Sequence, residues 1–494
     1  MKIAFINDSV ERLGVEYISA VLKANGHQVK LFVDPQLFDD ENISVKWLSS
    51  IFDYKKRLIS ELKAYKPDLI GISVVTDFYQ WACTIARMAK QEMGCPIIFG
   101  GIHPTSVPER VIKNDFVDMV CVGEGEYPML ELANSLEKGE IDYSIKNIWF
   151  KKDGKIIQNE IRHLIEDLDS LPMPDKELYY SASPHFSQCY YIMTSRGCQY
   201  NCSYCCHSYL KGLYKDKGRY IRSRSVKNVI RELNIAKQKY SFRNIRFFDE
   251  SLGSNNEWLR GFSTEYKRSI GLPFICYMHP DHVTSETLKY LKDAGCHEIE
   301  IGVQSGVEKI RRELLNRNMS NKAIGKALSL IKGKKISVIT DNIFGLPGEV
   351  QSDAIDLALF YNRNRVSRIY FFWLRFYPKI AITEWARENM KMPISEYERI
   401  MEGNNGRPFS CGGDMGGKDL IRLQLLFFIL PFFSEFIFKV IIKSKIYRII
   451  PIVYGPGILA MLTSLFSSSV NDKIIHKRFI LHYAYSINRL LRKV

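Results

Sequence analysis

Long apolar runs are scarce in this sequence. Only two stretches approach the roughly 20 apolar residues that a membrane-spanning helix needs, and both are interrupted. Residues 423–442 contain Pro431 and Glu435, and residues 446–466 contain Pro451 and a Gly-Pro-Gly turn. With 46% hydrophobic and 25% charged residues, the composition is that of a globular protein and excludes a largely disordered one. A length of 494 residues predicts two or three domains.

Cysteine is also sparse, with eleven residues in the chain. The opening segment MKIAFIND is typical of a strand and not of a secretory signal, so we expect a reducing, cytoplasmic compartment. Seven cysteines without framework spacing are expected to be small buried hydrophobes: Cys83, Cys95, Cys121, Cys189, Cys276, Cys296 and Cys411. The other four fall within 198–206, beside His207, which indicates a metal site rather than disulfides.

The first 140 residues alternate between two hydrophobic periods. Strand-like runs occur at 2–7, 27–33, 69–75, 96–101 and 119–123, and helix-like patterns occur at 15–26, 54–65, 79–93 and 127–139. This alternation predicts an α/β domain with a doubly wound, Rossmann-like parallel sheet, which binds ligands at the carboxyl ends of its strands. No G-x-G-x-x-G follows the first strand, so a dinucleotide ligand is poorly supported.

Small and polar residues follow these strands, and glycine there lets a bulky ligand approach the backbone. They include Ser73, Thr76, Gly100, Gly101, Glu124 and Gly125. In GVEYISAVLKANGH, IGISVVT, IIFGGIHPT and VCVGEGE, residues 1–140 resemble the cobalamin-binding domain. The resemblance implies that Ser73, Thr76, Gly100 and Gly101 line the slot for the nucleotide tail of cobalamin. We assign these four residues, together with Glu124 and Gly125, to cobalamin binding. Many proteins with this domain carry D-x-H-x-x-G after the first strand, and its histidine is the lower ligand of the cobalt. The loop NDSVERLG has no histidine, which implies a cobalt without that lower imidazole ligand.

The cysteine-rich loop has the spacing Cys198-x3-Cys202-x2-Cys205. Thiolates hold iron–sulfur clusters, and a [4Fe–4S] cluster normally takes four. Three ligands in one loop leave one iron open to a substrate or cofactor, which favours chemistry over electron storage. Cys206 is left outside the site because adjacent residues usually point apart. A zinc site is the alternative, with Cys206 or His207 as a fourth ligand, but no second C-x2-C is present.

The loop resembles the radical SAM motif C-x3-C-x-Φ-C, in which the aromatic position Φ is Tyr204 here. Strand-like segments alternate with helical ones after it: IRFFDESLGSN (245–255), LPFICYMHP (272–280), HEIEIGVQSGVEKI (297–310), ISVITDNIFGLPGE (336–349) and RIYFFWLRFYP (368–378). Residues 186–385 are therefore identified as a member of the radical SAM superfamily, whose fold is a partial (β/α)6 barrel. Residues 141–185 are interpreted as a linker.

The same resemblance assigns residues at strand ends to S-adenosylmethionine, whose amino and carboxylate groups the open iron chelates. Tyr204 lies by the adenine, Asp249 and Glu250 hold the ammonium, and Glu300, Gln304 and Ser305 hydrogen-bond the ribose and carboxylate. The GLPG segment, residues 345–348, packs near Tyr204. Arg317 is a candidate partner for the methionine carboxylate, whereas His103 and His279 are interpreted as loop or core residues.

Together the two resemblances imply a cobalamin-dependent radical SAM enzyme. Its [4Fe–4S] cluster reductively cleaves S-adenosylmethionine to a 5′-deoxyadenosyl radical, and an external reductant of the flavodoxin or ferredoxin type supplies the electron. The preferred function is methylation of an unactivated carbon of a small-molecule or lipid substrate. One alternative is an oxidoreductase or cyclase that holds cobalamin without methylating. Another is a non-catalytic iron–sulfur electron carrier. A methylthiotransferase is less favoured, because the sequence has no additional group of three cysteines near its N-terminus.

Residues 386–494 are predicted to form a mostly helical, basic and hydrophobic region. Residues 436–494 contain ten Lys or Arg residues and one acid, Asp472. One interpretation is a set of buried helices that cap the barrel. The other is a surface that contacts an anionic membrane at its inner face, which suits a lipid substrate. No nucleic-acid recognition motif is present, and CGGDMGG (411–417) is interpreted as a flexible loop.

Overall fold

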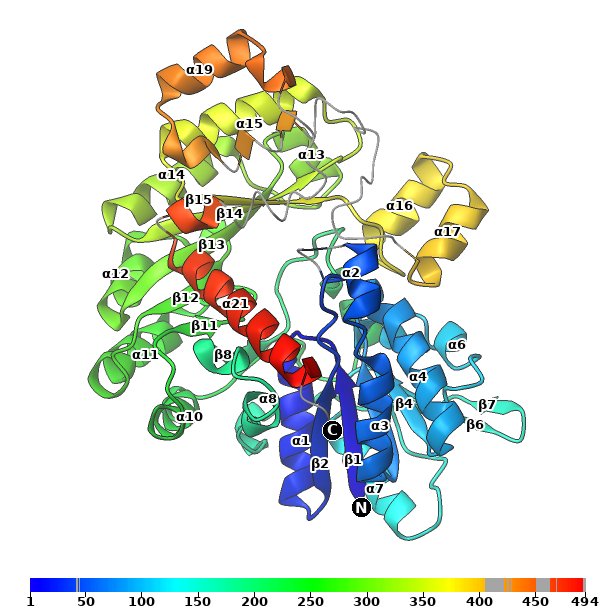
Figure 1. The fold of residues 1–494 in the computed structure, drawn as a ribbon. Coiled ribbons are helices and arrows are strands. Elements are labelled where there is room, and N and C mark those ends of the chain that lie inside the picture. The colour runs from blue at the N-terminus through cyan, green and yellow to red at the C-terminus, as the bar shows by residue number, and fades with distance from the viewer. Residues whose placement is uncertain are drawn as a thin grey trace.

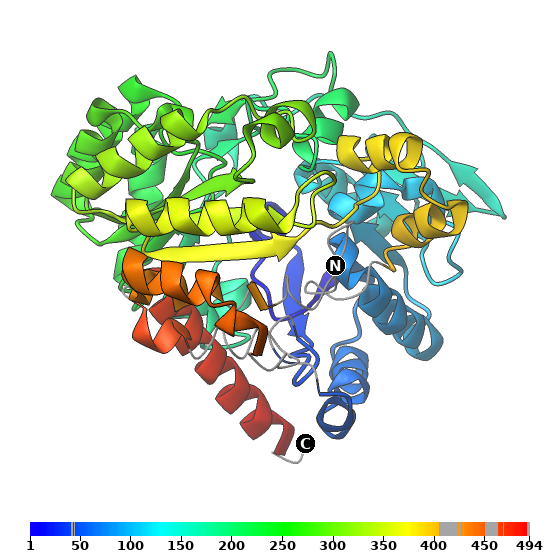
Figure 2. The ribbon, with the colours of Figure 1, turned by 90° about the horizontal axis from the view of Figure 1, so that it is seen from above.

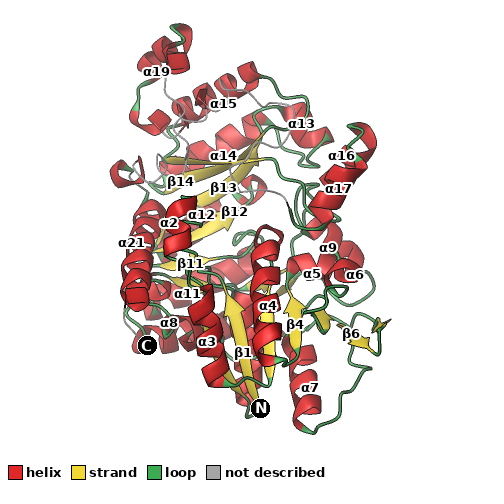
Figure 3. Cartoon of the chain, turned by 45° about the vertical axis from the view of Figure 1, so that its right-hand side comes forward, coloured by secondary structure: helices red, strands yellow, loops and turns green. Residues whose placement is uncertain are grey.

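The computed structural model describes residues 1–40, 43, 45–404, 422–423, 426–427, 429–449, 463–467 and 469–491. Cys411, the CGGDMGG segment and parts of both interrupted apolar runs lie outside these residues. Two separate parallel sheets dominate the described chain (Figure 1). Figure 3 shows the strands of the second sheet above those of the first.

The first sheet has the strand order β2-β1-β3-β4-β5-β6-β7, and its first five strands are parallel. These strands are β1 (Lys2–Asn7), β2 (Gln28–Val33), β3 (Leu69–Ser73), β4 (Ile97–Gly100) and β5 (Met119–Cys121). Helices α1 (Leu13–Ala24) and α7 (Glu126–Glu137) cover one face, and α3 (Lys55–Tyr65) and α4 (Tyr79–Met93) cover the other. Smaller helices are α2 (Lys46–Ile51), α5 (Ile102–Ser106) and α6 (Pro108–Val111). The predicted doubly wound sheet is confirmed.

Strand alternation explains how the sheet buries both faces. Successive side chains of a strand point to opposite faces. In β1, Ile3 and Phe5 therefore join the apolar cluster under α1 and α7, whereas Ala4 and Ile6 join the cluster under α3 and α4. A strand buried on both faces appears in the sequence as a continuous apolar run, as KIAFIN does.

A hairpin extends this sheet into the segment interpreted as a linker. β6 (Ile148–Lys152) pairs antiparallel with β5, and β7 (Lys155–Ile157) pairs antiparallel with β6. The short helix α8 (Glu177–Tyr180) follows, and its residue Tyr179 is buried against the first sheet's core. Much of 141–185 is therefore structured with the N-terminal domain.

The second sheet contains six parallel strands in sequence order. They are β8 (Tyr190–Ile192), β11 (Ile245–Phe247), β12 (Phe274–Met278), β13 (Cys296–Gln304), β14 (Ser337–Phe344) and β15 (Arg368–Trp373). The helices between them are α10 (Val226–Lys239), α11 (Asn256–Ser269), α12 (Ser285–Ala294), α13 (Glu308–Glu313), α14 (Asn321–Gly333) and α15 (Gln351–Asn364). β8 and β15 are the two edges, so this is the predicted partial barrel. A short ribbon, β9 (Ser195–Arg196) with β10 (Arg222–Ser223), flanks the loop that leads to α9 (His207–Leu213).

Side chains cap the barrel helices at their N-termini. Ser225, Asn255, Thr284 and Ser320 each accept a hydrogen bond from a backbone N–H in the first turn of α10, α11, α12 and α14 respectively. Such caps satisfy donors that the helix itself leaves unpaired, and each stabilises the fold by about 1 kcal/mol. Local sequence therefore sets where these helices begin.

The C-terminal region is helical where it is described. α16 (Ala381–Asn389) packs through Ile382 in a cluster with barrel residues, and α17 (Ile394–Met401) lies against the N-terminal domain, whose core includes Ile400 and Met401 (Figure 2). α19 (Glu435–Lys443) packs on α15, and α21 (Val470–Leu491) runs from the barrel toward the N-terminal domain (Figure 1). Among the described helices, none combines the length and apolarity needed to cross a membrane.

Candidate active site

The three predicted cluster ligands lie in the loop between β9 and α9. Gly197 begins this loop with φ at 88°, and a Cβ there would lie 2.2 Å from the carbonyl oxygen of Tyr220. Only glycine combines this backbone conformation with this close approach. Ser203 anchors the middle of the loop, since its amide donates to the carbonyl oxygen of Leu315 at 3.1 Å. The loop is therefore held at both its start and its centre.

The thiols of this loop are near one another and partly shielded from water. Cys202 is buried, and Cys198 and Cys205 are half-buried. Burial raises the pKa of the Cys198 thiol to about 11, and negative charge on Glu250, Cys205 and Cys202 adds to the shift. Thiols in this arrangement ionise readily only when a cation balances their charge. The loop therefore fits an iron–sulfur cluster, which binds thiolates.

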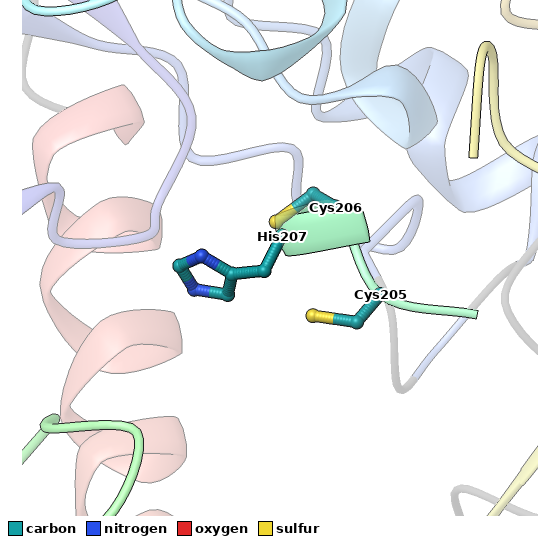
Figure 4. A group of neighbouring side chains, drawn as sticks. All are labelled: Cys205, Cys206 and His207. Carbon is teal, nitrogen blue, oxygen red and sulfur yellow. The ribbon is translucent and has the colours of Figure 1, made fainter. Parts of the chain in front are cut away.

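Cys206 and His207 lie closer to Cys205 than the sequence suggests. The Sγ atoms of Cys205 and Cys206 and a ring nitrogen of His207 lie within 4.8 Å of one another (Figure 4). The expectation that the adjacent cysteines point apart is wrong, because Cys206 has helical φ and ψ of −59° and −23°, and side chains alternate only in extended chain. This group has three members among the described residues, one fewer than a structural zinc site takes.

The two predicted ammonium-binding carboxylates have different surroundings. Glu250 is half-exposed, and its Oε1 lies 3.0 Å from Nε2 of His207. Burial lowers the pKa of His207, but the hydrogen bond and charge of Glu250 outweigh it and raise this pKa overall. Asp249 is buried and accepts hydrogen bonds from the amide of Thr194 at 3.1 Å and its hydroxyl at 2.7 Å. Glu250 therefore lies beside the cluster loop, while Asp249 fixes the chain after β8.

Arg317 connects the barrel to the cluster loop. Its Nη1 lies 3.5 Å from Sγ of Cys202 and 3.3 Å from the hydroxyl of Tyr204, and its Nη2 donates to the carbonyl oxygen of Gly302 at 2.6 Å. Gln304 ends the same strand as Gly302 with a left-handed φ of 71°. The structure thus brings Tyr204 and Arg317 together next to Cys202, a predicted cluster ligand, and Gln304 lies two residues after the strand position that Arg317 contacts. Tyr204 also packs in one apolar cluster with Leu346 of the GLPG segment.

The remaining predicted residues of the barrel bind partners within the protein. Glu300 forms an ion pair with Arg246 at 2.5 Å inside the barrel, and the hydroxyl of Ser305 donates to Glu349. His279 stacks on Tyr200 with ring centroids 3.7 Å apart, and burial lowers its pKa to about 2. His279 is therefore a neutral, packed side chain, as expected.

A cavity of about 350 Å³ lies between the first sheet and the cluster loop. One wall contains five of the six residues assigned to cobalamin: Ser73, Gly100, Gly101, Glu124 and Gly125. The opposite wall includes Gly197 from the cluster loop, and His207 and Tyr214 from the start and the C-terminal end of α9. The carboxyl ends of the first sheet and the cysteine loop therefore face one space.

Thr76 is the assigned residue that does not line this cavity. It is buried, and its Oγ1 lies 3.2 Å from Nδ1 of His103. Burial lowers the pKa of His103 to about 3, so this histidine is neutral. Thr76 and His103 form a packed pair behind the cavity wall.

Glycines give the cavity its shape. A Cβ at Gly101, where φ is 97°, would lie 2.7 Å from the carbonyl oxygen of Val74, and a Cβ at Gly123 would lie 2.0 Å from the hydroxyl of Tyr214. Glycine at these positions therefore lets the backbone of Val74 and the hydroxyl of Tyr214 pack directly against the strand ends. Among the described residues that line the cavity, the only imidazole is that of His207, from the cluster side. The wall therefore fits a corrinoid tail and offers no imidazole from the first sheet.

Sequence reasoning missed the ion pairs that join the two walls. Glu124 lies 3.1 Å from Arg196 and 2.9 Å from Arg222, and Glu126 lies 2.6 Å from Arg196. Burial opposes ionisation of Glu124, but the two arginines outweigh it and lower its pKa. The only signal in the sequence is the charged character of VGEGE and TSRGC. Nothing in the sequence pairs these segments.

Comparison with family models gives two matches in the expected order. Residues 4–133 match the B12 binding domain, and residues 192–361 match the radical SAM superfamily. The first match covers the sheet whose strand ends line the cavity, and the second covers the cysteine loop and most of the barrel.

Two curated relatives span most of these regions. An uncharacterized methyltransferase of Pyrococcus horikoshii is 26% identical over 336 residues, which cover 66% of this chain and 71% of the relative. An anaerobic magnesium-protoporphyrin IX monomethyl ester cyclase of Rubrivivax gelatinosus is 25% identical, with 68% of this chain and 59% of the relative covered.

A solved structure shares the fold over nearly the whole chain. The radical S-adenosylmethionine methyltransferase TsrM from Kitasatospora setae, with cobalamin and a [4Fe–4S] cluster bound, has a TM-score of 0.67 at 16% identity, and 99% of each chain is covered. The protein belongs to the B12-binding radical SAM enzymes. Its cofactors are those of the family: a [4Fe–4S] cluster, S-adenosylmethionine and cobalamin.

Proposed function

We propose that this enzyme methylates an unactivated carbon of a hydrophobic substrate. The observation that carries the proposal is the cavity that the strand ends of the B12 binding domain share with Gly197 of the cluster loop and His207 at the start of α9. A methyl donor on one wall and a radical source on the other can act on one substrate only if both reach the same space. When bound, the cofactors supply one-electron cleavage of S-adenosylmethionine and a transferable methyl group.

The chain's own residues have distinct roles in this proposal. Cys198, Cys202 and Cys205 hold the cluster. Arg317, buried beside Cys202, complements the carboxylate of S-adenosylmethionine, and half-exposed Glu250 complements its ammonium. A flavodoxin- or ferredoxin-type protein supplies the electron.

The methyltransferase relative from Pyrococcus horikoshii and the fold shared with TsrM support methyl transfer. The relative named as a cyclase favours a second candidate, in which the enzyme holds cobalamin but oxidises or cyclises its substrate. Both candidates use the same cysteines and the same cavity. They differ in whether the methyl group of S-adenosylmethionine is transferred to the substrate.

Label transfer tests the proposal without knowledge of the substrate. The reconstituted enzyme is incubated anaerobically with reductant and with S-adenosylmethionine labelled on its methyl group. The proposal expects label on the retained corrinoid and release of S-adenosylhomocysteine. Corrinoid that stays unlabelled while 5′-deoxyadenosine accumulates would instead favour the cyclase candidate. In the control variant Cys202→Ala, 5′-deoxyadenosine formation is expected to be abolished while corrinoid is retained.

A further inference from the structure

Apolar side chains are exposed together at the edge of the barrel domain. Six residues form what we call the C-terminal apolar face: Phe432, Phe436, Ile437, Val440, Ile449 and Phe466. Phe436 and Ile449 are each 76% exposed, and Phe466 is 78% exposed. Phe466 and Phe432 line one groove of about 270 Å³, so separate segments meet at this face. Figure 1 shows its helix, α19, on the side of α15 away from the N-terminal domain.

Helix α19 is apolar on both of its sides. Phe438 is fully buried, and Ile441 and Ile442 pack against the barrel core. The outward side nevertheless presents Phe436 and Val440, one helical turn apart, to solvent. Surface helices of globular proteins usually present polar residues there. A contiguous exposed apolar patch of this kind marks an interaction surface.

Cations surround the apolar residues. Lys439, Lys443, Lys445 and Arg448 are all exposed, and they alternate with the apolar side chains along α19 and the turn after it. Glu435 is the one acid within residues 429–449, and it pairs with Lys439 at 2.7 Å. The face therefore combines insertable apolar side chains with a net positive charge, which is the pattern of helices that lie in the headgroup region of a membrane.

We propose that the C-terminal apolar face docks on the surface of an anionic phospholipid membrane. A symmetric contact between two copies of this chain would bring the same four cations against one another, so charge opposes self-association. Nine residues of α19 rise only about 14 Å, roughly half the hydrocarbon thickness, so the helix lies on the bilayer and does not cross it. The inference does not depend on which reaction the enzyme performs.

Sedimentation with vesicles tests the docking. Full-length protein is mixed with vesicles of equal parts phosphatidylcholine and phosphatidylglycerol, or with phosphatidylcholine alone. We expect binding to the anionic vesicles and little binding to the neutral ones. The double variant Phe436→Ser, Ile449→Ser is expected to lower the partition coefficient at least about tenfold, because two exposed apolar side chains no longer insert. Lys443→Gln with Lys445→Gln is expected to weaken binding at low salt and to reduce its salt dependence.

The matched control is Ile394→Ser, which removes an isoleucine that is 80% exposed on α17, outside the face. It should bind vesicles as the unchanged protein does. Equal melting temperatures of all variants confirm that they fold. Absence of vesicle binding, equal binding to neutral and anionic vesicles, or equal loss in the Ile394→Ser control would each overturn the proposal. If the protein did not bind vesicles but formed dimers in sedimentation velocity, and if Phe436→Ser abolished these dimers, the face would instead be a site of self-association.

Discussion

Arg196 lies two residues before Cys198, the first predicted cluster ligand, and pairs with two carboxylates of the N-terminal domain. Its guanidinium lies 3.1 Å from Glu124 and 2.6 Å from Glu126, and all three side chains are at most 16% exposed. A single planar, permanently charged group thus links the cysteine loop to the strand end after β5. This link holds the start of the cysteine loop against the strand end of the N-terminal domain.

Replacing this arginine should cost stability and alter the cavity. In Arg196→Met, the buried side chain of Glu126 loses its ion-pair partner, and we expect a loss of about 3 kcal/mol in the free energy of unfolding, together with weaker retention of corrinoid. Urea unfolding and the absorbance of bound cobalamin measure these two effects. The matched control is Arg219→Met, because the pair of Arg219 with Glu166 is exposed and contributes less than about 1 kcal/mol. Equal losses in the two variants would contradict the assigned role.

Single residues were predictable where chemistry fixes their spacing. The three cysteines and Tyr204 follow from a local motif, and glycines at strand ends follow from backbone geometry. The pair of Glu124 with Arg196 joins positions 72 residues apart, and no local pattern encodes such a contact. Cys206 was misjudged because the helical turn that begins at this residue is a property of the folded loop.

At the scale of elements, α21 is the part of the C-terminal region that joins the domains. At its start, Asn471 accepts a hydrogen bond from Arg246 inside the barrel, and Asp472 accepts one from Tyr370 at 2.7 Å. Near its end, Nε2 of His482 lies 2.9 Å from the carbonyl oxygen of Pro35 in the N-terminal domain. The helix therefore closes the interior of the open barrel and also holds the N-terminal domain.

The first turn of α21 should be a stability determinant. Asp472 forms a buried ion pair with Arg368 at 3.1 Å. Asp472→Asn leaves the arginine with a neutral partner, and we expect the free energy of unfolding to fall by about 3 kcal/mol. Lys473→Ala, at the next and exposed position, should change it by less than about 0.5 kcal/mol. Denaturant unfolding compares the two. An Asp472→Asn protein with an unchanged midpoint would show that the barrel does not rely on this helix.

The regular elements were predictable because each has its own hydrophobic periodicity. Four of the barrel helices, α10, α11, α12 and α14, also begin after Ser, Asn or Thr caps, and the strands are short apolar runs. The hairpin of β6 and β7 was missed, since two short strands at a sheet edge leave little pattern. The contacts of α21 with the barrel agree with the interpretation of the C-terminal region as helices that cap the barrel. Its contact with the N-terminal domain was not predicted, because a mixture of basic and apolar residues suits a membrane surface as well as a domain contact.

The whole molecule places two cofactor-binding domains around one cavity. The first sheet supplies a wall of glycines and small polar residues, and the barrel supplies the cysteine loop on the other side. The order of the domains was predictable from two separate motifs. The cavity between the two domains was not predictable, because it forms through packing of segments that are far apart in the sequence.

Anaerobic reconstitution with iron, sulfide and hydroxocobalamin would show whether this chain binds both an iron–sulfur cluster and a corrinoid. After desalting, bound iron is quantified and the absorbance spectrum of the corrinoid is recorded. We expect about four irons per chain and retained corrinoid whose cobalt has no histidine ligand from the first sheet, since that sheet offers the cavity no imidazole among the described residues. A chain that holds its cluster but releases all corrinoid would contradict the account, because the cavity would then serve neither cobalamin nor methyl transfer.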